Sequence, residues 1–143
     1  MEYSQAFQIS ASGMAVEKLR LELTASNLAN MHTSSARPED VYRPLRVLSE
    51  SVPLKFAQQF NKLSVAGGGV RVARIASQQG APRLVYEPGH PNADTKGFVA
   101  YAAVDHAREM LNVNLAVRAY EANVIAMNAA KVMASRTLDI GRQ

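Results

Sequence analysis

Residues 103–143 read AVDHAREMLNVNLAVRAYEANVIAMNAAKVMASRTLDIGRQ. No Pro and no Gly interrupts this run before Gly141, so nothing in its interior should break a helix. Its apolar side chains recur at steps of four and three, which is the spacing of a helix that packs lengthwise against another helix. This first stripe consists of Val113, Val117, Tyr120, Val124, Met127, Ala134 and Leu138.

A second apolar stripe runs along the same helix and begins about 200° round the helix axis from the first. A helix that is apolar on two nearly opposite sides cannot be satisfied by one partner helix in a small monomer. We therefore expect the chain to be a building block rather than a free-standing enzyme. The second stripe consists of Leu111, Leu115, Ala122, Ile125, Ala129 and Val132.

The N-terminal segment 4–30 is expected to form another helix, with Ser4 able to cap it. Gly13 lies in its interior, where glycine costs about 1 kcal/mol relative to Ala, and we interpret it as the site of a slight bend. Asn30 should end the helix, because asparagine tolerates the left-handed backbone conformation. Apolar positions repeat every seven residues on two faces, at Phe7, Met14, Leu21 and Leu28 and at Ile9, Val16 and Leu23.

The middle of the chain contains short apolar runs separated by Pro, Gly and Asn, which favour strands and turns. Residues 49–66 are ambiguous, because some side chains are helix-spaced but Pro53 and the nearby Gly67-Gly68-Gly69 suggest a loop with a short helix. The helix-spaced side chains in that segment are Phe56, Phe60 and Leu63. The expected strands are 41–48, 70–75, 84–86 and 98–101.

Two local sequence signals precede the C-terminal helix. Pro88-Gly89 fits the central positions of a type II turn, which requires a positive φ at Gly89. Asp105 is a plausible N-cap or first-turn acid, because a carboxylate there favours the positive end of the helix dipole.

These elements predict a mainly α fold with a small β-rich insert, held together by an antiparallel coiled coil of the N- and C-terminal helices. The expected domains are residues 1–33, an insert at 34–102, and residues 103–143. The C-terminal helix would be roughly 50 Å long and the N-terminal one about 40 Å. Part of the longer helix must therefore find a partner elsewhere.

Composition excludes several classes of function. The chain has 143 residues, 48% of them hydrophobic, which suits one ordered domain rather than a disordered chain. It has no Cys, so disulfides, thiolate nucleophiles and Cys-ligated zinc are impossible. No segment approaches the roughly 20 apolar residues of a membrane span. The N-terminus lacks a basic region followed by an apolar run, so we expect no cleaved signal peptide.

The positive charge is concentrated in the middle of the chain. Residues 31–98 carry nine basic and five acidic groups, whereas the two flanking segments together have a net charge of zero. Nine basic residues spread over nearly seventy are too dilute for a dedicated nucleic-acid reader. A small basic helical nucleic-acid-binding protein nevertheless stands as an alternative of a different class.

No catalytic or cofactor-binding constellation is visible, so we expect no enzyme activity and no cofactor. His90 with Glu87 and Asp94 would offer an oxygen-rich metal site, but Pro88, Gly89 and Pro91 explain the segment better as a structural turn. Gly67-Gly68-Gly69 precedes a strand and lacks the Lys-Ser/Thr of a phosphate loop, so it is read as a hinge or tight turn.

Several polar side chains interrupt the apolar stripes of the C-terminal helix. Arg118, Lys131 and Arg136 either extend to solvent at a rim or form salt bridges between subunits. The asparagines are either exposed or buried where they fix the register between helices. These asparagines are Asn112, Asn114, Asn123 and Asn128.

Four motifs together resemble the bacterial flagellar basal-body rod proteins, and most closely the proximal rod type. They are Ala25-Ser26-Asn27-Leu28-Ala29-Asn30 with Thr33, then Tyr42-Arg43, then Leu84-Val85-Tyr86-Glu87-Pro88-Gly89-His90-Pro91, and finally Arg118-Ala119-Tyr120-Glu121-Ala122-Asn123. The resemblance covers essentially the whole chain. The positions that carry it are Ser26, Asn27, Leu28, Ala29, Asn30, Thr33, Glu87, Pro88, Gly89, Asp94, Tyr120, Glu121 and Asn123.

The resemblance implies a structural, non-enzymatic subunit of the hollow rod that serves motility and crosses the periplasm. It implies export through the flagellar type III apparatus without a cleaved signal peptide, and terminal helices that pack helically around a central channel. The implied partners are copies of itself, other rod proteins, the export apparatus, the membrane ring and rod-base adaptor proteins, but neither nucleic acid nor a membrane span. Another proximal-rod component is the alternative within the same class.

The two stripes and the N-terminal helix supply the residues expected to pack subunits together. They are Leu21, Leu28, Leu111, Leu115, Val117, Tyr120, Val124, Ile125, Met127, Val132 and Leu138.

Overall fold

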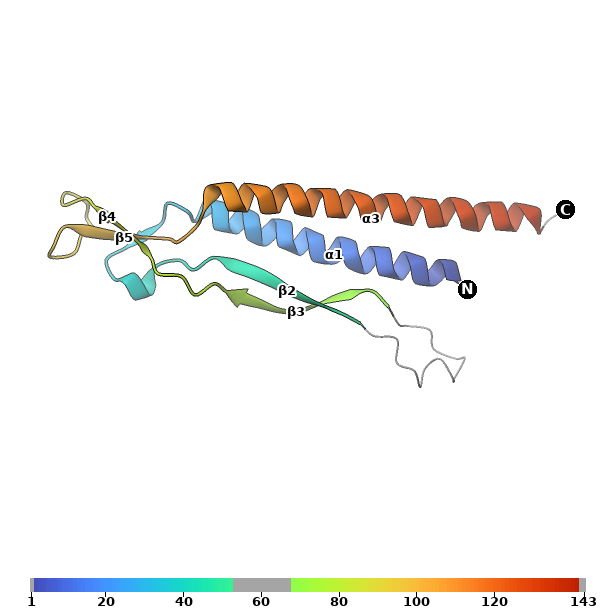
Figure 1. The fold of residues 1–143 in the computed structure, drawn as a ribbon, viewed down its shortest axis with the longest axis horizontal. Coiled ribbons are helices and arrows are strands. Elements are labelled where there is room, and N and C mark those ends of the chain that lie inside the picture. The colour runs from blue at the N-terminus through green and yellow to red at the C-terminus, as the bar shows by residue number, and fades with distance from the viewer. Residues whose placement is uncertain (1, 53–67, 142–143) are drawn as a thin grey trace.

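The molecule is elongated, with two long antiparallel helices lying side by side along its length (Figure 1). A computed structural model describes residues 2–52 and 68–141. Helix α1 spans Glu2–Ala29 and helix α3 spans His106–Ile140. The C-terminal end of α3 extends beyond the start of α1 (Figure 1).

Two antiparallel sheets accompany the helices. A two-stranded sheet pairs β2 (Leu45–Ser51) with β3 (Val70–Ser77), and this hairpin lies along α1 (Figure 1). A three-stranded sheet at one end of the molecule has the order β1-β5-β4. Its strands are Ser34–Ser35, Phe98–Tyr101 and Arg83–Tyr86, respectively, and a short 3-10 helix, η1, spans Pro38–Asp40.

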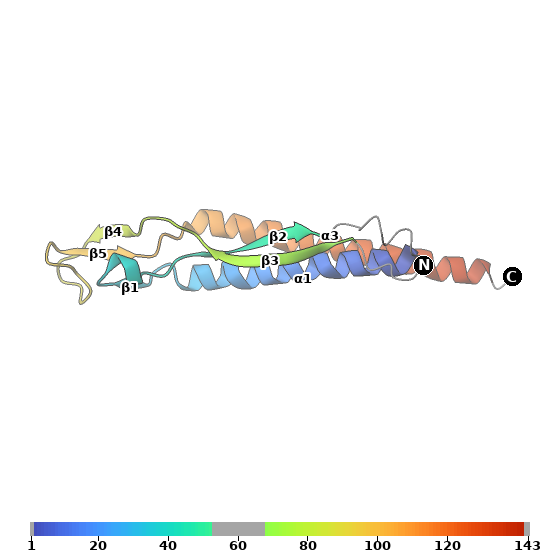
Figure 2. The ribbon, with the colours of Figure 1, turned by 90° about the horizontal axis from the view of Figure 1, so that it is seen from below.

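The prediction of a mainly α fold held by a coiled coil is wrong. Helices make up 52% of the structure and strands 20%, and the β2–β3 hairpin covers a side of α1 that the prediction left free (Figure 2). Apart from Val16, the buried positions of the helix pair are small or polar, whereas a coiled coil needs large interlocking apolar side chains. These positions are Ser10, Val16, Thr24 and Asn27 of α1 and Glu109, Ala116 and Ala130 of α3.

Side-chain hydrogen bonds to the backbone mark the start of α3 and the end of α1. Asp105 caps α3 as predicted, because its carboxylate accepts from the backbone N–H of Ala107 at 3.0 Å and of Arg108 at 3.2 Å. Helix α1 ends just before Asn30, but not through a left-handed residue, since only glycines have positive φ among the described residues. Instead, the Asn30 side-chain amide donates to the Ser26 carbonyl at 2.8 Å.

The expected type II turn at Pro88-Gly89 is also wrong in detail. The His90 N–H donates to the Glu87 carbonyl at 3.1 Å, which closes a β-turn, but Gly89 does not have a positive φ. The glycine that needs this conformation is Gly97, with φ of +82°, where a Cβ would lie 2.9 Å from the Tyr86 ring. Its left-handed conformation closes the tight turn into β5.

The largest buried cluster is small and lies at the junction of the three-stranded sheet with α3. It consists of Val41, Ala100 and Ala102, with Tyr42 and Val104 packed against it. The helix-spaced residues Phe56, Phe60 and Leu63 lie outside the described residues. In the part of the chain that is described, no helix is long and apolar enough to span a bilayer.

Candidate assembly surface

Asn27 joins three elements at the end of α1, and it is only 1% exposed. Its Nδ2 donates to the Leu45 carbonyl at 3.0 Å and to Glu109 Oε2 at 3.1 Å. Its Oδ1 accepts from the Leu45 N–H at 2.8 Å and from the Tyr42 hydroxyl at 2.9 Å. One side chain therefore fixes α1 against both the first residue of β2 and the first turn of α3.

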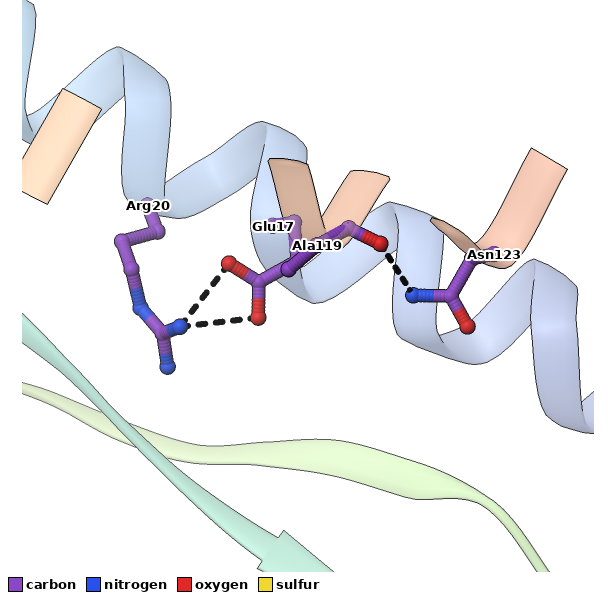
Figure 3. A network of polar contacts seen from close by, with 4 residues as sticks. All are labelled: Glu17, Arg20, Ala119 and Asn123. Carbon is purple, nitrogen blue, oxygen red and sulfur yellow. Dashed lines mark hydrogen bonds and ion pairs between the residues drawn. The ribbon is translucent and has the colours of Figure 1, made fainter. Parts of the chain in front are cut away.

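A polar cavity of about 210 Å³ lies beside this junction, between the helices and β2. Glu109, only 4% exposed, lines it together with Arg20, Arg46 and Asn112. The Arg20 guanidinium is held on its own helix by Glu17, at 2.8 Å to each carboxylate oxygen (Figure 3). Glu109 and Arg20 are thus already committed to contacts within the chain, with Asn27 and Glu17.

Further along the helix pair, Gly13 of α1 faces Asn123 of α3. A Cβ at residue 13 would lie 2.7 Å from Asn123 Oδ1, so only glycine permits this close approach. The amide of Asn123 is oriented by donating to the Ala119 carbonyl at 2.8 Å (Figure 3). Close contact between the helices therefore gives the physical reason for a glycine in the middle of α1.

A second polar contact holds the far end of the hairpin on α1. The Ser12 hydroxyl accepts from the Val70 N–H at 3.1 Å and donates to the Ile9 carbonyl at 2.7 Å. Gly69 has φ of +111°, and a Cβ there would lie 2.6 Å from Ser12 Oγ. Asn27 and Ser12 thus attach the hairpin near both of its ends.

The face of α3 that points away from α1 is apolar and uncovered in the single chain. Leu111, Leu115, Ile125 and Val132 of the second stripe are 56%, 55%, 68% and 48% exposed. Near the C-terminal end, Leu138 and Ile140 are 70% and 77% exposed. Such a row of large exposed apolar side chains marks an interaction surface.

The loop between β4 and β5 is held by its own side chains. The Tyr101 hydroxyl donates to Glu87 Oε2 at 2.9 Å, and this hydrogen bond raises the pKa of Tyr101. Asp94 Oδ1 accepts from the N–H groups of Phe98 at 2.9 Å and Lys96 at 2.8 Å. The Phe98 bond is the main cause that lowers the pKa of Asp94.

The three side chains considered as a metal site are each used within this loop. Glu87 binds Tyr101 and Asp94 binds backbone N–H groups, while His90 Nδ1 accepts from the Asn92 N–H at 3.1 Å. The described residues contain no group of three or more metal-ligating side chains.

Comparison with known proteins gives relatives of nearly the same length. The chain is 35% identical to the flagellar basal-body rod protein FlgC of Bacillus subtilis, over 96% of this chain and 97% of the relative. It is 38% identical to FlgC of Escherichia coli O6:H1, over 95% and 96%, and 32% identical to FlgC of Aquifex aeolicus, over 97% of each. The chain belongs to the FlgC family of flagellar basal-body rod proteins. No protein-family model matches it.

Membership of the FlgC family confirms the resemblance found in the four motifs, and with it a structural protein of the flagellar basal-body rod. Among the motif positions, the structure brings Asn27 close to Tyr42, and Glu87 close to the turn closed by Asp94. Asn123 lies apart from both groups, where it contacts Gly13. The motifs of this FlgC-family chain therefore occupy three separate positions in the fold.

The predicted packing residues divide between two surfaces. Leu111, Leu115, Ile125, Val132 and Leu138 are exposed, whereas Val124, Met127, Leu21 and Leu28 are half-buried. Val117 and Tyr120, at 38% and 37% exposed, lie at the edge between them. Their role in packing subunits stays a prediction.

Two residues that organise the fold were not identified from the sequence. Glu109 is an acid in the first turn of α3, where such residues are usually solvated, and nothing in its sequence neighbours indicates burial. Ser12 lies between Ala11 and Gly13 in a run of small residues, which in a helix indicates close approach of a neighbouring helix rather than a polar contact. Only the hairpin, which brings Val70 to it, shows that its hydroxyl forms a hydrogen bond between elements.

Proposed function

We propose that this chain is a structural subunit of the proximal part of the flagellar rod, and that it assembles through the outer face of α3. The observation that supports this proposal is the row of exposed apolar side chains on that face. Water-exposed leucine and isoleucine gain about 1.5–3 kcal/mol each when fully buried, so a neighbouring subunit that covers them stabilises the contact.

The proposal includes copies of the same chain and other rod proteins as neighbours, since a face that meets a different surface on the next subunit generates a helical tube. The terminal segments 1–33 and 103–143 would form the axial part and residues 34–102 a separate insert. Location in the periplasm and export through the flagellar type III apparatus without a cleaved signal peptide belong to the same proposal. So do contacts with the membrane ring and rod-base adaptor proteins.

The test is to replace Leu115 or Ile125 with Asp in a flagellated host. Swimming in soft agar and recovery of basal bodies that contain the rod are then measured. Because both side chains are more than half exposed, the single chain should fold normally while subunit packing fails. We expect both variants to be produced at wild-type levels but to be non-motile.

The matched control is Ser135→Asp, which adds the same carboxylate at an exposed position of α3 without removing apolar surface. It should swim normally. If Leu115→Asp and Ile125→Asp also swim normally, the outer face of α3 is not an assembly surface.

A further inference from the structure

Strand β4 lies at the open edge of the three-stranded sheet, because the strand order is β1-β5-β4. Figure 1 shows this sheet at the end of the molecule opposite to both chain termini, beyond the β2–β3 hairpin. The other edge strand, β1, is only two residues long, and the Asn92 side-chain amide already binds the Ser34 carbonyl there at 3.3 Å. The free edge of β4 is therefore the place where this sheet can accept another strand.

The register of β4 with β5 determines which backbone groups point outward from the sheet. The Glu87 N–H donates to the Gly97 carbonyl at 2.8 Å, in register with the ladder between β4 and β5. Backbone groups of alternate residues point to the same side of an antiparallel strand, so those of Val85 also face β5. The N–H and C=O groups of Leu84 and Tyr86 consequently point away from the sheet.

Two prolines restrict the register in which another strand could pair with this edge. Pro82 stands two residues before Leu84 and Pro88 two residues after Tyr86, and neither proline has an N–H to donate. If a second copy of β4 slipped by two residues in either direction, one of its outward carbonyls would meet a proline instead of a donor. The unslipped register is therefore the one that satisfies every outward group of Leu84 and Tyr86.

The segment from Arg83 to Glu87 is complementary to itself when it is reversed. In an antiparallel pair of two copies centred on Val85, Leu84 of one copy lies opposite Tyr86 of the other, which joins the outward backbone groups of both. Arg83 then lies opposite Glu87, so that a guanidinium faces a carboxylate on each side of the centre. Opposite charges and apolar side chains that face each other across two strands stabilise their pairing.

The side chains at this edge are already positioned for such a contact. The Tyr101 hydroxyl holds the Glu87 carboxylate at 2.9 Å, and the Arg83 guanidinium lies 5.6 Å from the centroid of the same Tyr101 ring. Within residues 2–52 and 68–141, Arg83 forms no ion pair of its own. On the opposite face of β4, Leu84 and Tyr86 are 59% and 64% exposed, and the pairing would bring these apolar side chains of the two copies together.

We propose that two copies of the free chain pair through the β4 edge, so that their sheets form one continuous antiparallel sheet across a two-fold axis at Val85. One register satisfies the outward backbone groups, places opposite charges together and covers Leu84 and Tyr86. A two-fold contact closes after two copies, so it belongs to the chain outside the rod and goes beyond the assembly proposed for α3. The pairing would also cover an edge strand that otherwise offers a template for aggregation.

A single cysteine at the proposed axis tests the register, since the chain itself has no Cys. In the pair, residue 85 of each copy faces residue 85 of the other with their Cα atoms about 4.5 Å apart, a spacing that a disulfide can span. We expect mild oxidation of the full chain carrying Val85→Cys to give a disulfide-linked dimer that a reducing agent separates. The matched control is Ser77→Cys, at the exposed end of β3, which should remain mainly monomeric.

Exchange of the charges tests the pairing without a covalent bond. In sedimentation equilibrium, Arg83→Glu and Glu87→Arg should each weaken dimerisation about tenfold, because each places like charges opposite each other. The double variant that carries both changes should return to within about threefold of the wild type. Leu84→Pro removes an outward N–H but no hydrogen bond to β5, so it should abolish the dimer while the far-UV circular dichroism stays that of the wild type.

Three results would overturn the proposal. They are a wild-type chain that stays monomeric up to about 1 mM, equal crosslinking of Val85→Cys and Ser77→Cys, and a double charge variant that dimerises more weakly than either single one. Association through the outer face of α3 does not bring residue 85 of two copies together. A negative result here would therefore leave the proposed role of α3 in rod assembly untouched.

Discussion

Replacing Asn27 with Ala should destabilise the whole molecule, because α1, α3 and β2 meet at this side chain. Tyr42 can turn to the Ser26 hydroxyl, already 3.4 Å away, and Glu109 borders a polar cavity. The N–H and C=O of Leu45 both bind Asn27 and both lose this partner. Each buried group left without a partner costs about 1–3 kcal/mol, so we expect a loss of about 3 kcal/mol in the free energy of unfolding.

Urea unfolding followed by far-UV circular dichroism measures this loss. Asn114→Ala is the control, because Asn114 is exposed on α3 and its replacement should change stability by no more than about 0.5 kcal/mol. Asn27→Asp keeps the shape and the acceptor but removes the Nδ2 donor and adds a charge beside Glu109, so it should be destabilised as well. If Asn27→Ala unfolds at the same urea concentration as Asn114→Ala, the reasoning about this junction is refuted.

Two further predictions concern the helix contact and the β4–β5 loop. Gly13→Ala should be destabilising despite the better helix propensity of alanine, because its Cβ would lie 2.7 Å from Asn123 Oδ1. Adding Asn123→Ala should restore stability. A Gly13→Ala variant as stable as the wild type would contradict the close approach. The hydrogen bond from the Phe98 N–H lowers the pKa of Asp94 below its ordinary value in the folded chain, so the contribution of Asp94 to stability is present above the ordinary pKa and is lost as pH falls through the folded pKa. Asp94→Asn should therefore lower the thermal midpoint more at pH 6 than at pH 2, and equal shifts at both pH values would argue against the charge effect.

Local signals in the sequence were sufficient for the long helices. An uninterrupted run with Asp105 before it predicts α3, and the structure begins the helix at His106. These signals act within one turn, through a side chain that binds the nearest N–H groups. They are independent of what the helix packs against, which is why they could be read without the fold.

The β2–β3 hairpin could not be predicted at its full length. Its pairing register shifts between Leu48 and Ser49, and a bulge of this kind interrupts the alternation on which a strand prediction depends. Most side chains of β3 are exposed, so the apolar pattern is weak as well. The predicted strands 41–48 and 70–75 therefore stop short of the observed ends at Ser51 and Ser77.

Asn27 and Glu109 show a different limit of prediction from sequence periodicity. Periodicity finds large apolar side chains and assigns them to the buried side of a helix. In this helix pair the close approach at Gly13 favours small and polar residues at the most buried positions, such as Ala116 and Ala130, whereas the large side chains of the second stripe lie outside. The first apolar stripe consequently mixed inner residues such as Met127 with exposed ones such as Leu138.

This inversion has an energetic consequence for the proposed assembly. Leu111, Leu115, Ile125 and Val132 are each about half covered in the single chain, so complete burial by a neighbour would contribute roughly 1 kcal/mol per side chain. No one of these contacts would be decisive by itself, but the four act together on one rigid helix. A single Asp among them would replace one contribution by the cost of burying a charge, which is several kcal/mol. That asymmetry is why Ile125→Asp should abolish rod assembly, whereas Ile125→Ala should only weaken it.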